Sequence, residues 1–100
     1  MPAFKKGDEI EIPCAVEQGA FPTEVLVSFN TVEGPVSGFV RKEFVSRVDQ
    51  GGKGYIRGIV REVSSDVITV LLKGSFFTTT GLASLPRDWA NKHVQMARAA

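Results

Sequence analysis

The sequence predicts a mainly β protein: a small barrel or sandwich of five to six antiparallel strands with a short C-terminal helix. Two observations support this fold. Apolar and polar residues alternate along several short segments, as expected for half-buried strands, and clusters of glycine, proline, serine and aspartate separate these segments. At 100 residues, the chain has the length of one domain, 1–100.

A β-hairpin is predicted from Tyr55–Val63 and Val67–Leu72, joined by a polar turn at 64–66. Alternation along the first arm places one set of residues inside (Ile56, Gly58, Val60) and another outside (Tyr55, Arg57, Ile59, Arg61). The second arm is apolar on both faces, which is typical of a covered strand. Gly58 removes a side chain in mid-strand and predicts a bend, a bulge or a close approach of another segment.

Three strands are expected before this hairpin. The first carries alternating apolar residues from Ile10 to Val16, interrupted by Pro13, which predicts an edge strand or a bend because proline cannot donate to a ladder. Val25–Val32 and Val36–Val40 are the next two strands.

In the C-terminal segment, the spacing of apolar residues changes from the alternation of a strand to the period of a helix. A short strand is expected at Leu82–Leu85, and Pro86 suits a first helical position. Trp89, His93, Met96 and Ala100 then follow helical spacing and predict a helix that covers one end of the sheet.

An internal similarity appears at an offset of 45 residues, where GFVRKEFV and ASLPRDWA share an apolar, basic, acidic, aromatic order. It suggests two related halves, 8–49 and 53–98. The alternative is chance similarity between two β-rich segments. Gly38-Phe39-Val40 before Phe44, and Ser84-Leu85-Pro86 before Trp89, also resemble the end of a Src-homology-three-like barrel. That resemblance implies a fold only, since the acidic-aromatic motif of its peptide-binding members is missing.

Composition narrows the functional classes. The net charge is +1, but residues 1–50 hold eight acids and five bases, whereas residues 51–100 hold three acids and seven bases. Such an asymmetry can mark a face for polyanions, and a mixed surface is the alternative. No apolar run approaches a membrane span or a secretory signal, and the lone Cys14 has no intramolecular disulfide partner, so we expect a cytoplasmic protein.

The sequence contains no motif that supports a catalytic function. Cys14 with His93 would need a group that orients the histidine, and a small apolar core residue explains the cysteine better. Glu9 and Glu11 fit a solvated strand face. The GGKG segment lacks phosphate-loop spacing, and one histidine with one cysteine is too few for a typical zinc site. We therefore predict no catalytic residues, no metal and no cofactor.

Two surfaces are candidates for binding. Basic and aromatic residues gather around the hairpin and suit single-stranded nucleic acid; they are Lys53, Tyr55, Arg57, Arg61, Lys73, Phe76 and Phe77. Phe21, Ile59, Phe76 and Phe77 exceed what a small barrel easily buries and predict a contact with a protein partner or a second copy. The sequence thus favours a non-enzymatic interaction module of unknown partner, which is either another protein or a second copy in a homodimer. Nucleic-acid binding is the alternative, and an enzyme of unknown type is third.

Overall fold

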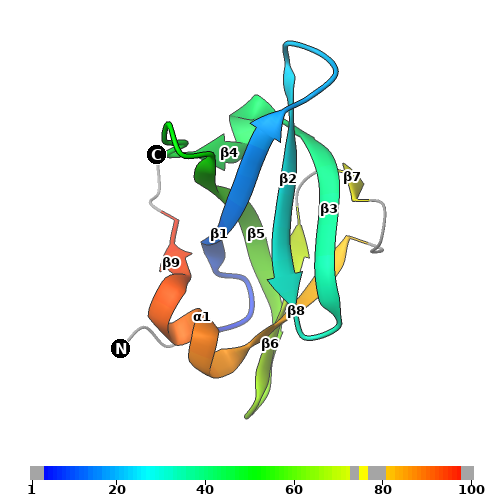
Figure 1. Ribbon diagram of the computed structural model, residues 1–100. Coiled ribbons are helices and arrows are strands. Elements are labelled where there is room, and N and C mark those ends of the chain that lie inside the picture. Colours follow the sequence, from blue (N-terminus) through cyan, green and yellow to red (C-terminus); the bar gives the residue numbers. More distant parts are fainter. Residues whose placement is uncertain (1–3, 73–74, 77–80, 98–100) are drawn as a thin grey trace.

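The computed structural model describes residues 4–72, 75–76 and 81–97. Within these residues, an antiparallel sheet is curled into a half-barrel with one short C-terminal helix (Figure 1). The strands are β1 (Glu9–Gln18), β2 (Glu24–Thr31), β3 (Gly34–Arg41), β4 (Val45–Ser46), β5 (Lys53–Val63), β6 (Val67–Leu72), β7 (Ser75–Phe76), β8 (Leu82–Pro86) and β9 (Gln95–Met96). The helices are the 3-10 turn η1 (Lys42–Phe44) and α1 (Arg87–His93). The predicted fold class is confirmed, and the described residues form nine strands where five to six were expected.

The strand order is β7-β3-β2-β1-β5-β6-β8, and every pair is antiparallel. Curling brings the end of β2 to β8, where the Val32 N–H donates to the Ser84 carbonyl at 2.9 Å. Two short strands complete the sheet: β4 pairs with β5, and β9 pairs with β1. Each half of the chain therefore ends on the first strand of the other half. The suggested repeat of 8–49 and 53–98 stays a prediction.

Alternation along the strands explains the core. Alternate residues of the long strands face inward and are fully or almost fully buried, including Ile10, Ile12, Val27, Val40, Ile56, Val60, Ile68, Val70 and Leu85. The hairpin faces are as predicted: Ile56, Gly58 and Val60 are buried. This burial is the main stabilising contribution to the fold.

Gly58 marks a close approach of neighbouring residues. A Cβ atom there would lie 3.2 Å from the Leu71 carbonyl oxygen and 3.6 Å from Cδ1 of Ile12. The β-bulge of this hairpin lies further on, between Val60 and Glu62, so Arg61 is the extra residue.

Two sequence expectations are corrected. The C-terminal helix ends at His93 instead of continuing to Met96, because Val94 adopts an extended conformation and its side chain returns to the core. Met96 then pairs with Ile10 as part of β9, and Ala100 lies outside the described residues. The strand with Pro13 is not an edge strand, since β1 has β5 on one side and β2 and β9 on the other.

Candidate interaction cleft between strands β1 and β2

The ladder between β1 and β2 stops at Pro13. Pairing runs from Gln18 opposite Val25 to Ala15 opposite Ser28. The Val16 N–H bonds toward the β5 side, and the Glu9 carbonyl accepts from Ala97 on the β9 side. Odd-numbered residues of β1 therefore direct their backbone groups toward β2 and β9. The next bonded pair would join Pro13 to Asn30, but proline has no N–H to donate.

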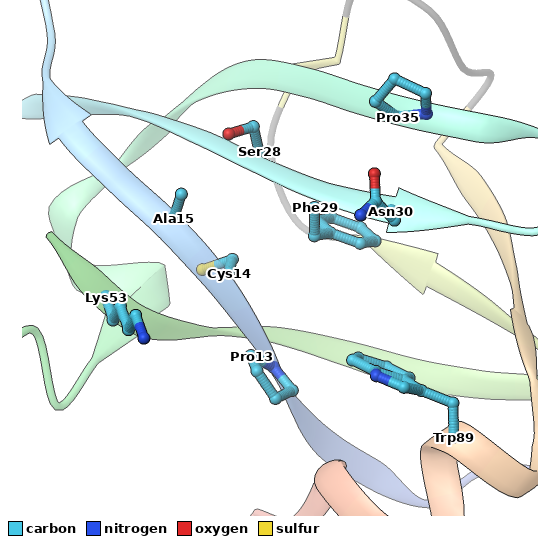
Figure 2. Close-up of a pocket in the computed structure, with 9 residues that line it drawn as sticks. All are labelled: Pro13, Cys14, Ala15, Ser28, Phe29, Asn30, Pro35, Lys53 and Trp89. Atoms are coloured by element: carbon cyan, nitrogen blue, oxygen red, sulfur yellow. The ribbon is translucent and has the colours of Figure 1, made fainter.

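A cleft of about 650 Å³ lies where these strands separate (Figure 2). Residues of β1, β2 and α1 contribute most of its walls, and the complete lining is Pro13, Cys14, Ala15, Ser28, Phe29, Asn30, Pro35, Lys53 and Trp89. The buried Cys14 and Phe29 side chains belong to the core. An opening between strands therefore brings apolar core residues within reach of a ligand.

The Trp89 side chain, at one side of the cleft, is positioned by contacts with His93 of the same helix. Its ring stacks on His93 with centroids 5.1 Å apart, and Nδ1 of His93 lies 3.0 Å from the Trp89 carbonyl oxygen. Among the described residues of the lining, Lys53 contributes the charge, and its side chain is exposed. The cleft combines a large aromatic surface with one cation, which suits an apolar ligand with an acidic group nearby.

The chemistry of Cys14 does not favour a nucleophile. Burial raises the pKa of the Cys14 thiol to about 12, so the thiol is protonated at neutral pH. His93, its suggested partner, is exposed, and its Nδ1 pairs with the carbonyl oxygen of Trp89. Among the described residues, no three histidine, cysteine, aspartate or glutamate side chains are grouped as metal ligands would be.

The structure places part of the predicted nucleic-acid face on β5. Lys53, Tyr55 and Arg57 alternate along its outer side, and Arg61 follows in the bulge. The Arg47 guanidinium lies 4.1 Å from the centre of the Tyr55 ring, and Arg57 stands opposite Glu11 of β1. Of Phe76 only the backbone is described, in β7 opposite Gly38, and Lys73 and Phe77 lie outside the described residues. Arg47 therefore covers one face of the Tyr55 ring that was expected to stack on a base. Glu11 places a negative charge beside Arg57, which was expected to bind a phosphate.

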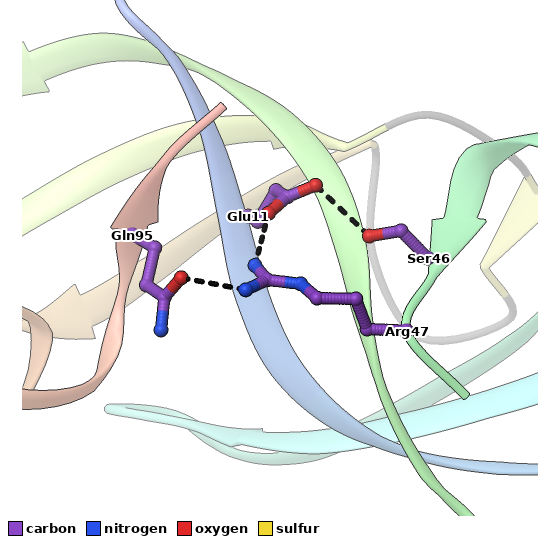
Figure 3. Close-up of polar contacts among 4 residues, drawn as sticks. All are labelled: Glu11, Ser46, Arg47 and Gln95. Atoms are coloured by element: carbon purple, nitrogen blue, oxygen red, sulfur yellow. Dashed lines mark hydrogen bonds and ion pairs between the residues drawn. The ribbon is translucent and has the colours of Figure 1, made fainter. Parts of the chain in front are cut away.

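Sequence reasoning missed a polar cluster next to this face (Figure 3). Glu11 is buried and accepts hydrogen bonds from Ser46 Oγ, at 2.9 Å, and from Arg47, with which it forms an ion pair. Arg47 also donates to Gln95 Oε1 at 2.8 Å and has a φ of 53°, in the left-handed region. Alternation had assigned Glu11 to a solvated face. The cluster instead ties β4 and β9 to β1.

Comparisons with protein-family models, with curated proteins and with solved structures find no significant match to this chain. Within the described residues, no helix is both long and apolar enough to cross a bilayer. The functional inference therefore depends on the cleft and on the surfaces around it.

Proposed function

We propose that this protein is a non-enzymatic interaction module that binds a short protein segment in the cleft between β1 and β2. The interrupted ladder supports the proposal most directly. Pro13 ends the pairing and leaves the backbone of Asn30 directed toward the opening, beside apolar side chains and Trp89. Such a site offers apolar contacts and backbone hydrogen-bonding groups together, as peptide-binding grooves do.

The side chains that line the cleft favour binding over catalysis. General acid-base work needs a titrating group near the working pH, and nucleophilic catalysis needs an activated nucleophile. The Cys14 thiol is neutral, and Lys53 is an exposed cation at the margin. A lysine in that position suits recognition of a carboxylate on the bound segment.

Selection from a random-peptide library on the immobilised protein tests this function. Ala15→Arg places a bulky charged side chain at an exposed position of the lining, whereas Ser65→Arg adds the same side chain on the exposed turn after β5. We expect selected peptides to change the fluorescence of Trp89, the one tryptophan of the sequence, and to lose binding in Ala15→Arg but not in Ser65→Arg. Equal binding by both variants would place the site elsewhere.

Single-stranded nucleic-acid binding is the second candidate, because Lys53, Arg57 and Arg61 lie along one strand. Peptide binding in the cleft is preferred, because Glu11 stands opposite Arg57 and Arg47 covers one face of the Tyr55 ring. Titration of labelled single-stranded DNA and RNA at low and near-physiological salt separates the two functions. Tight binding that weakens steeply with salt, and disappears in the Arg57→Ala, Arg61→Ala double variant, would reverse this order.

A further inference from the structure

We propose that the cleft between β1 and β2 receives the Phe21 tip of a second copy of this chain. The inference depends on the proposed function, since it names the occupant of the same cleft. It starts from a second unusual surface: the loop that joins β1 to β2 carries the most exposed of the large apolar side chains described, Phe21, at 63% exposure.

The loop presents Phe21 on a defined backbone. The Gly19 N–H donates to the Glu24 carbonyl at 3.3 Å, the Glu24 N–H donates to the Phe21 carbonyl at 3.1 Å, and the Lys42 N–H donates to the Thr23 carbonyl at 3.0 Å. Gly19 permits this closure, because a Cβ atom there would lie 2.6 Å from the Glu24 carbonyl oxygen. A fixed loop loses little conformational freedom when its aromatic side chain is buried, which is what a strong interface anchor requires.

The tip and the cleft are chemically complementary. The cleft offers apolar side chains and the Trp89 ring to an aromatic group, and Lys53 is exposed at its margin. The exposed Glu17 lies on the end of β1 that carries the tip, whereas Glu24 of β2 stands opposite Arg41 of β3. Docking of the tip therefore brings the Glu17 carboxylate toward the Lys53 cation while it covers Phe21.

The positions of tip and cleft also allow a closed pair. The loop that joins β1 to β2 lies at one end of the molecule and α1 lies toward the other (Figure 1). The cleft is lined by residues of β1 and β2 together with Trp89 of α1. A two-fold axis across two antiparallel hairpins places each tip over the cleft of the other copy. The two contacts are then identical, as in an isologous dimer.

Sedimentation velocity over a concentration series tests this inference. We expect the wild-type chain to dimerise, and Phe21→Ser to raise the dimer dissociation constant about thirtyfold or more. Ala15→Arg should have a similar effect, since it blocks the receiving cleft. Leu82→Ser removes another exposed apolar side chain, on β8, and should leave the dimer intact. A monomeric wild-type chain, or a dimer unaffected by Phe21→Ser, overturns the inference.

Mixing the two disruptive variants gives a sharper test. Phe21→Ser retains an intact cleft and Ala15→Arg retains an intact tip, so their mixture restores one of the two contacts. We expect the mixture to associate more tightly than either variant alone, and no recovery between folded variants overturns the proposal. Peptide selection on Phe21→Ser is scored separately. Peptide binding by a monomeric chain would overturn the self-association and leave the proposed function standing. A wild-type dimer whose folded Phe21→Ser variant selects no peptide would restrict the cleft to the tip of a second copy and overturn the binding of other protein segments.

Discussion

The β1–β2 and β5–β6 hairpins both alternate buried and exposed residues, but their two strands stay paired over different lengths. The β1–β2 ladder ends at Ala15 opposite Ser28, whereas the β5–β6 ladder continues to Gly58 opposite Leu72. Pro13 lacks a backbone donor and Gly58 lacks a side chain. A missing N–H thus opens a strand pair beside the core, while a missing Cβ lets a strand pair close tightly over it.

The closed hairpin gives the largest expected effect on stability. Gly58→Val places atoms against the Leu71 carbonyl and the Ile12 side chain, so we expect a loss of about 3 kcal/mol in the free energy of unfolding, measured by urea denaturation. Ile59→Val, on the outer face next to it, should cost about 1 kcal/mol or less. Equal costs for the two variants would show that the close approach at Gly58 carries no special constraint.

The open hairpin is tested by the reactivity of Cys14 at its base. Because burial raises the pKa of this thiol to about 12, the native protein should react with a disulfide reagent at pH 8 about a hundredfold or more slowly than the urea-unfolded chain. In a Cys14→Ser background, Ser65→Cys in the exposed turn after β5 should react fast. Fast reaction of native Cys14 would mean that the cleft opens deeper than the structure shows.

The raised pKa also predicts a pH dependence. The unfolded thiol ionises near its ordinary pKa of 9.0, whereas the folded thiol does so only near 12. The contribution of the neutral thiol to stability is therefore complete below about pH 9 and is lost as the pH rises toward 12. Cys14→Ala should remove this part of the alkaline loss in urea denaturation. An unchanged alkaline profile would contradict the assignment.

Beyond the break at Pro13, β1 is held by β9 and by the Glu11 cluster. Glu11→Ala leaves Ser46 and Arg47 without their acceptor, and we expect a loss of about 1 to 2 kcal/mol, together with faster hydrogen exchange at the Ala97 amide, which bonds to Glu9. Glu9→Ala at an exposed position should change stability by about 0.5 kcal/mol or less. Unchanged exchange at Ala97 would separate the cluster from the attachment of β9.

Pro13→Ala should change stability only slightly, within about 1 kcal/mol, because a restored hydrogen bond offsets the greater freedom of the unfolded chain. The new amide at position 13 can donate to Asn30 and extend the β1–β2 ladder. We expect that amide to be protected from hydrogen exchange and the cleft to bind peptides more weakly. An unprotected amide would show that Trp89 and α1, not Pro13, keep the strands apart.

The sequence was sufficient for the β-rich fold, since burial of alternate residues dictates the strands and the faces of the β5–β6 hairpin. The sequence was insufficient where pairing between distant segments determines the local structure. Helical spacing placed Met96 on a helix, but burial of Val94 turns the chain back and pairs Met96 with Ile10. The role of Glu11 depends on Arg47, whose left-handed backbone carries no signal of the kind that glycine or asparagine gives. The cleft had one visible sign, the proline at position 13.

The last strand of each half pairs with the first strand of the other half, β4 with β5 and β9 with β1. This pairing has a consequence for synthesis on the ribosome. β1 emerges first, but its partner β5 begins at Lys53 and its last bond comes from the amide of Ala97. The first half of the nascent chain therefore waits with apolar strands uncovered, exposed to aggregation until the second half arrives. The acidic residues that alternate along β1 keep this waiting segment charged, in the way that gatekeeper residues do.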